Sequence, residues 1–156
     1  MRLRVLGPGR WLASMVILSL SLLLVACGGP GSSSTASSTA PAGAQTVEIT
    51  ETDFAIRSSL TTFRPGVPYH FVIRNQGVVA HEFLIMPRSE GAMGQHDAME
   101  EMHHMALAMV DNIPPGASVT LDYTFPSSAA GSRPEFACYL PGHYEAGMKL
   151  TVAVAR

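Results

Sequence analysis

Three side chains with soft donor atoms follow one another at equal spacing near the C-terminus. Cys138, His143 and Met148 lie five residues apart in the segment Cys-Tyr-Leu-Pro-Gly-His-Tyr-Glu-Ala-Gly-Met. A thiolate, an imidazole and a thioether form a set of ligands that suits copper. Pro141 and Gly142 are typical of a loop, and a loop of this length lets the three side chains turn toward one ion. The spacing therefore predicts a copper site.

A second imidazole would complete a trigonal site made of two histidines and one cysteine, with methionine as a weak axial ligand. His81 is the natural candidate, because it follows Gly-Val-Val-Ala and precedes an apolar run. Zinc is the main rival metal, but it prefers a closed tetrahedral set and has little use for a thioether. A Cys-His hydrolase pair is disfavoured, since no orienting acid or oxyanion arrangement is apparent.

The ligand pattern resembles that of cupredoxins of the plastocyanin/azurin group, over roughly residues 46–156. The resemblance implies a type 1 (blue) copper held by His81, Cys138, His143 and Met148, with His143 as the route for electrons at the solvent edge. The chain departs from the family in two ways. Glu82 follows the first histidine, where many members have an Asn that links the two ligand loops. The loop from Cys138 to Met148 is also one residue longer than in several azurin-like members.

The same region reads as short β-strands separated by Pro/Gly turns, which is typical of an all-β Greek-key sandwich. The predicted strands are 46–49, 69–73, 82–86, 119–125, 136–139 and 150–154. Residues 92–110 are rich in Met, Ala and Glu and contain no proline, so we expect one inserted helix there.

Histidines and methionines alternate along the predicted helix. His96, Met99, Glu100 and His103 would form one stripe, while Met102, Met105 and Met109 would form a second. An accessory Cu(I) site made by His96, Met99, Met102 and His103 is one interpretation. The other is that the methionines pack against the sandwich and the histidines face water. The insert is similar to Met/His-rich segments of copper-tolerance cupredoxins.

The N-terminal part is unlike the rest of the chain. Residues 1–26 contain three arginines followed by a charge-free apolar run, typical of an export signal. The residues Leu24-Val25-Ala26-Cys27 resemble the lipobox of bacterial lipoproteins, which implies cleavage before Cys27 and lipid on its sulfur. Residues 27–45 are expected to be a lipidated cysteine and a flexible Ser/Gly/Ala tether. A plain transmembrane anchor and a disulfide between the two cysteines are the alternatives.

These features predict an extracytoplasmic protein anchored by lipid to the outer face of the cell membrane or the periplasmic side. Without residues 1–26 the chain has 7 basic and 12 acidic residues, since three of its 10 basic residues lie in the signal, so its net charge is −5. It lacks the basic balance of nucleic-acid-binding proteins.

We expect a monomeric electron carrier that meets redox protein partners in the membrane or envelope. The alternative function is a copper-handling or copper-tolerance protein that buffers or delivers Cu(I) through the Met/His insert. We do not expect an enzyme, because six histidines cannot supply the additional centres of a multicopper oxidase.

Overall fold

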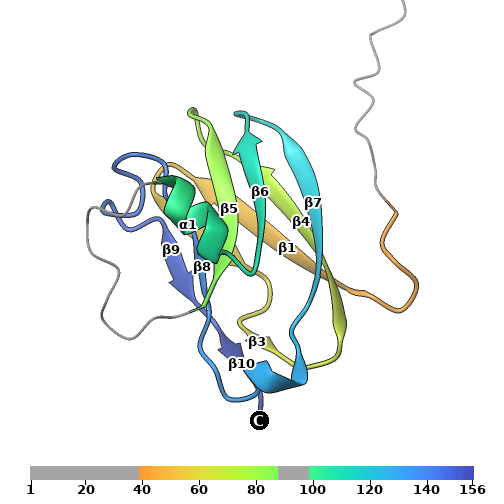
Figure 1. Cartoon of the computed structure of the whole chain (residues 1–156). Coiled ribbons are helices and arrows are strands. Elements are labelled where there is room, and N and C mark those ends of the chain that lie inside the picture. Colours follow the sequence, from red (N-terminus) through yellow and green to blue (C-terminus); the bar gives the residue numbers. More distant parts are fainter. Residues whose placement is uncertain (1–38, 88–98) are drawn as a thin grey trace, which may run out of the picture. The chain divides into compact units, whose positions relative to one another are not determined.

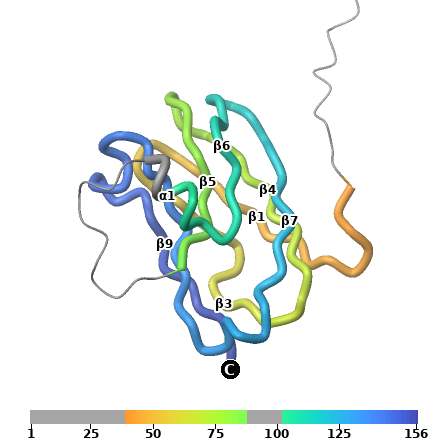
Figure 2. Tube along the Cα trace, in the orientation of Figure 1, coloured from red at the N-terminus to blue at the C-terminus, as the bar shows by residue number. Residues whose placement is uncertain are grey.

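Two four-stranded sheets pack face to face in the computed structural model, which describes residues 39–87 and 99–156. Figure 1 shows the two layers and Figure 2 follows the same chain path as a tube. The first sheet has the order β2-β1-β4-β7, made by Ala55–Ser58, Gln45–Thr52, Pro68–Asn75 and Ser118–Thr124. The second has the order β6-β5-β8-β9, made by Ala108–Ile113, His81–Met86, Glu135–Ala137 and Lys149–Thr151.

Smaller elements complete the fold. Strands β3 (Thr62–Phe63) and β10 (Ala153–Val154) pair in parallel as a two-stranded sheet. Helix α1 (Met99–Met105) follows β5 along the chain, and a short 3₁₀ helix spans Ser127–Ala129. In the described part of the chain, no helix is long and apolar enough to cross a membrane.

Alternation along β1 fills one side of the core. Val47 and Ile49 are fully buried, and their neighbours Thr46 and Glu48 are exposed. This period of two turns every second side chain toward the opposite sheet. Glu51 continues the series and is therefore also fully buried.

Strand β5 is buried on both faces. Phe83 and Ile85 belong to the core between the sheets, whereas Leu84 and Met86 belong to a second apolar cluster that includes Met102 of α1. Helix α1 therefore packs against the outer face of this sheet. The alternation also decides how the first two residues of β5 point: His81 shares the face of Phe83, and Glu82 shares the face of Leu84.

The all-β sandwich with an inserted helix is confirmed, but the predicted helix over residues 92–110 is too long. Residues 92–98 lie outside the described part of the chain. The helix ends at Met105, and Ala108–Ile113 forms edge strand β6, in which Met109 pairs with Leu84. Pairing with the open edge of β5 outweighs the local helix propensity of these residues. Strands β2 and β3, which the sequence pattern did not predict, are too short to show a clear period.

Candidate metal centre

His81 and Cys138 meet because their strands are antiparallel neighbours. His81 is the first residue of β5, and Cys138 directly follows the last residue of β8. The two strands pair with Leu84 opposite Ala137, so the start of one strand lies beside the end of the other. Both side chains are fully buried.

The loop from Cys138 to Met148 returns on itself through backbone hydrogen bonds. The Met148 amide donates to the His143 carbonyl at 3.0 Å, and the Cys138 amide donates to the Met148 carbonyl at 3.2 Å. Gly142 and Gly147 have positive φ angles of 82° and 104°, a region that other residues rarely adopt. These turns bring His143 back over Cys138.

Three donor atoms lie close enough together to hold one ion. The Nδ1 atoms of His81 and His143 are 3.3 Å apart, and the Cys138 Sγ is 3.4 Å from the His143 Nδ1. All three donor atoms lie within 4.8 Å of one another. Bonds of roughly 2.0 Å to imidazole and 2.3 Å to thiolate, in a trigonal plane, separate the donors by roughly 3.5–3.8 Å. The residues therefore fit a metal ion with little movement.

Met148 is joined to this group through its backbone. The hydrogen bonds above link its amide and carbonyl to the segments of His143 and Cys138. Its side chain is fully buried in the same apolar core as Cys138. Its role as axial ligand stays a prediction.

The second nitrogen of the His81 ring faces a carboxylate. His81 Nε2 is buried and has no hydrogen-bond partner in the part of the chain that the structure describes. It lies 3.7 Å from Asp53 Oδ1, which accepts a hydrogen bond from the Val78 amide. Gly77 leaves room for this pair, because a Cβ atom there would lie 2.4 Å from Asp53 Oδ1 and 2.8 Å from His81 Nε2. Metal-bound histidines commonly donate their other N–H to a carboxylate. Sequence reasoning missed Asp53, which gives no signal of its own in the β1–β2 turn.

Glu82 stands where many cupredoxins have the Asn that links the two ligand loops. Here Glu82 itself makes the link. Its side chain is fully buried, and Oε1 accepts the Tyr139 amide at 2.8 Å. Asn75 instead donates to the carbonyls of Val79 and Ile113 and accepts the Gly77 amide. Asn75 therefore holds the loop before His81, and Glu82 holds the segment after Cys138.

Burial shapes the electrostatics of the metal-free cluster. Desolvation raises the pKa of the Cys138 thiol to about 11, although backbone hydrogen bonds from Glu82 and Leu140 act in the opposite direction. Desolvation, followed by the neighbouring His143, lowers the pKa of His81. The neutral imidazole is the form that binds a metal, and the thiol must lose its proton when a metal binds.

Glu51 is a buried acid that sequence reasoning missed. Neither carboxylate oxygen has a hydrogen-bond partner among residues 39–87 and 99–156. Burial, together with the charge of Glu82, raises the pKa of Glu51 to about 8. Its spacing of two from Ile49 was the available signal.

Exposed apolar side chains lie on the solvent side of the site. Phe54 lies edge-on to His143 with ring centroids 5.5 Å apart, and it is 48% exposed. Val78 and Val79, in the loop before His81, are also exposed. Tyr139 and Tyr144 stack on each other with centroids 4.6 Å apart.

The candidate residues of the accessory copper site have different surroundings. Met102 is buried against Leu84 and Met86, and His103 Nε2 lies 2.9 Å from Glu82 Oε2. Met99 begins α1, but its side chain lies outside the described part of the structure, as does all of His96. Met109, expected on the second stripe, lies in β6 instead. The accessory site stays a prediction.

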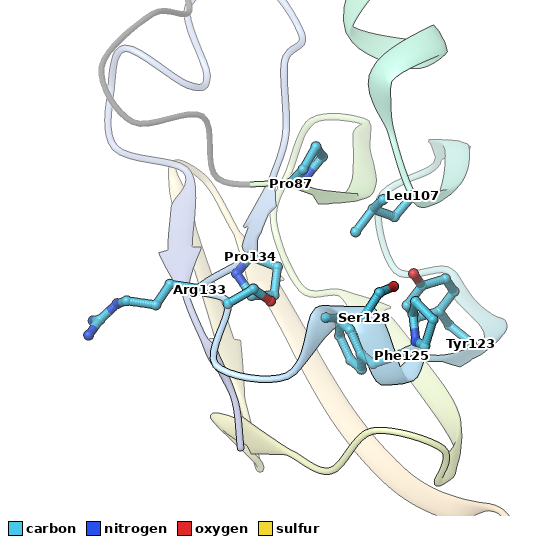
Figure 3. A pocket seen from close by; sticks show the side chains of 10 residues that line it. Pro87, Leu107, Tyr123, Phe125, Ser128, Arg133 and Pro134 are labelled. Carbon is cyan, nitrogen blue, oxygen red and sulfur yellow. The ribbon is translucent and has the colours of Figure 1, made fainter. Parts of the chain in front are cut away.

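A pocket of about 260 Å³ lies near the end of β5 and the start of β8 (Figure 3). None of the predicted ligands lines it. Its walls are mostly apolar and include Pro87, Leu107, Tyr123, Phe125 and Pro134.

Curated relatives of the chain are copper-resistance proteins. It is 40% identical over 95 residues to the copper-resistant cuproprotein CopI of Rubrivivax gelatinosus, a match covering 60% of this chain and 55% of that protein. It is 26% identical over 140 residues to the CopI of Pseudomonas aeruginosa, covering 69% and 76%. The chain thus spans about half the length of the Rubrivivax relative. No family model matches the chain.

Solved structures with the same fold are auracyanins. A dithionite-reduced auracyanin from Roseiflexus castenholzii has a TM-score of 0.55 at 24% identity, covering 73% of this chain and all of that one. Auracyanin A from Chloroflexus aurantiacus, described as a "blue" copper protein, has a TM-score of 0.56 at 20% identity, covering 72% and 99%. The chain therefore has the β-sandwich of the cupredoxins.

Proposed function

We propose that this chain binds one copper ion through His81, Cys138, His143 and Met148 and transfers single electrons outside the cytoplasm. The observation that supports this most directly is the convergence of two imidazole nitrogens and one sulfur within 4.8 Å. Copper bound by such a set supplies a one-electron redox couple. The names of the relatives, which describe copper-resistant cuproproteins, agree with the choice of metal.

The protein's contribution is to hold the donors still. His81 belongs to a strand buried on both faces, and the other donors lie in a loop closed by its own hydrogen bonds. Donors that keep their positions in both oxidation states reduce the rearrangement that accompanies loss or gain of one electron. This rigidity favours a carrier.

His143 is the proposed route for electrons. It is half-buried, and exposed Phe54 packs on its edge, with Val78 and Val79 exposed beside the same end of the sandwich. A small apolar surface of this kind suits brief docking of a redox partner. A His143→Gly variant and a Phe54→Ala variant should both slow electron self-exchange, and exchange as fast as in wild type would contradict this route.

Copper titration of the full chain tests the metal proposal. Wild type should bind one copper tightly and show an intense visible thiolate band, and Cys138→Ser should lose the band. His81→Gln should change the copper content and the colour. His70→Gln is its matched control and should change neither, because His70 is also buried but pairs with Asp122 at 2.6 Å. Unchanged copper content and colour in both Cys138→Ser and His81→Gln would overturn the proposal.

Copper handling is the second candidate, and the names of the relatives favour it. In this function the chain must bind Cu(I) ions in addition to the copper held by His81, Cys138, His143 and Met148. Titration with Cu(I) should then show two or more ions per chain, and the combined change of His96 and His103 to alanine should abolish the extra binding. A stoichiometry of one in wild type would exclude it.

We further propose export and lipid anchoring through Cys27, from the signal-like residues 1–26 and the lipobox-like Leu24–Cys27. A Cys27→Ser variant should move from the membrane fraction to the soluble fraction and lose incorporation of labelled fatty acid. Equal membrane association of the two forms would contradict lipidation.

A further inference from the structure

Glu82 is a buried carboxylate with a partner on each oxygen. It is 0% exposed, Oε1 accepts the Tyr139 amide at 2.8 Å, and Oε2 accepts the Nε2–H of His103 at 2.9 Å. A charged group inside a protein is costly unless it is paired and hydrogen-bonded. Both bonds therefore offset the cost of burying this side chain.

The bond to Tyr139 fixes the distance between the two segments with metal ligands. Glu82 follows His81 and Tyr139 follows Cys138, so a single side chain joins the neighbours of two donors. The Glu82 backbone amide also donates to the Cys138 sulfur. Glu82 thus contacts the cysteine segment through both its backbone and its side chain.

The bond to His103 attaches helix α1 to the same point. The imidazole of His103 is 25% exposed, so it closes the outer side of the buried carboxylate. Its neighbour Met102 is buried against Leu84, Met86 and Ala137, in a cluster that also contacts Tyr139 and Tyr144. An apolar contact and a hydrogen bond therefore hold α1 over the segment that follows Cys138.

We propose that His103 is a positioning residue for the metal centre: by orienting Glu82, it fixes the segment of Cys138 relative to His81. The proposal rests on the proposed function only in that the cluster binds copper. Because His103 belongs to the Met/His insert, this proposal links the insert to the metal centre. Any ligand that draws His103 away from Glu82 changes the surroundings of Cys138.

The test compares His103→Ala with His103→Gln in the full chain. Alanine removes the donor, whereas the amide of glutamine can still donate to Glu82. His104→Ala is the matched control, since His104 is an exposed neighbour on the same helix turn. In the metal-free protein, His103→Ala should speed hydrogen exchange of the Tyr139 amide about tenfold, the effect of losing one hydrogen bond to a charged group. In the copper form it should shift the thiolate band and the reduction potential.

Recovery of slow exchange and of the band position in His103→Gln supports positioning. Loss of stability in His103→Ala with unchanged Tyr139 exchange, band and potential overturns it, because His103 then acts only as a packing residue. If wild type binds no copper, the proposed function fails, and the exchange measurements on the metal-free protein still decide whether His103 positions the segment.

Discussion

At the scale of single residues, the centre combines donors with buried acidic side chains, which are unusual in a core. Cys138 and His81 are fully buried, and so are the carboxylates of Glu51 and Glu82. Glu82 has two hydrogen-bond partners, whereas Glu51 has none in the described structure. The two acids therefore behave differently: Glu82 is paired, and Glu51 is kept neutral by its surroundings.

Glu51 should make the metal-free protein less stable as the pH rises. Its pKa is about 8 in the folded chain against an ordinary value of 4.5, so the unfolded chain releases a proton that the folded chain keeps between these values. The free energy of unfolding therefore falls with increasing pH across this range. Glu51→Gln, which cannot ionise, should match wild type near pH 5 and exceed its stability at pH 8, by an amount on the order of several kcal/mol.

Urea denaturation of the metal-free proteins at several pH values measures this difference. Glu48→Gln controls for the loss of one carboxylate from the same strand, since Glu48 is exposed. Stability curves of wild type and Glu51→Gln that run parallel from pH 5 to pH 8 would contradict the assignment.

At the scale of elements, the site depends on turns that bring strand ends together. The β4–β5 loop is held by Asn75, and the β1–β2 turn places Asp53 beside the outer nitrogen of His81. Gly77 lies where the two meet. The close approach of turn and loop therefore requires a residue without a side chain.

Gly77→Ala should damage both stability and metal binding. Its Cβ atom would approach Asp53 Oδ1 and His81 Nε2 to less than 3 Å, so the loop or the imidazole must move. Overpacking of this kind typically costs about 1–3 kcal/mol, measurable by denaturation of the metal-free protein. Copper affinity should fall as well, because the displaced ring is a ligand.

Two further variants make the Gly77 prediction specific. Val78→Ala changes the next residue, which is 81% exposed, and should have little effect on either quantity. Adding Asp53→Ala to Gly77→Ala removes the closest contact and should restore part of the stability. A Gly77→Ala protein as stable as wild type would contradict the prediction, because the β4–β5 loop would then move without a cost in stability.

At the scale of the whole molecule, the two sheets are joined by a cluster of aromatic rings around Phe63. Phe63 of β3 is fully buried, and its ring lies 5.0–5.8 Å from four others, those of Tyr69, Phe71, Phe125 and Phe136. In Figure 1, β3 and β10 lie at the end of the sandwich remote from the β4–β5 loop. Phe63 is thus packed at the end of the domain remote from the β4–β5 loop and the start of β5 (Figure 1).

Phe63→Ala should therefore lower stability without changing the centre. Removing a buried phenylalanine typically costs about 3–5 kcal/mol, which denaturant unfolding would measure, while the remaining folded protein should bind copper with the wild-type band. Phe54→Ala is the comparison at the metal end of the domain, because Phe54 is half exposed and contacts His143. This variant should slow electron self-exchange, as proposed above. A large change of the copper band in Phe63→Ala would show that the two ends are coupled.

Local sequence was enough to predict the β-sandwich and to place three of the proposed ligands in one loop. Cys138 and His143 are joined by a short segment with turn residues, so the closeness of the Cys138 Sγ to the His143 Nδ1 follows from covalent spacing. Alternation of Val47 and Ile49 likewise predicted a half-buried strand, which the structure confirms. Such patterns are readable because they depend on neighbours along the chain.

The partners of these residues were decided by tertiary structure. His81 and His143 are 62 residues apart, and their contact depends on the pairing of β5 with β8. Ala108–Ile113 is a strand because it pairs with the open edge of β5, which outweighs its helix propensity. Glu82 acquired its role only when Tyr139 and His103 were folded onto it from two other elements. Long-range pairing fixes these contacts, and nothing in the residues near position 82 specifies which groups will arrive there.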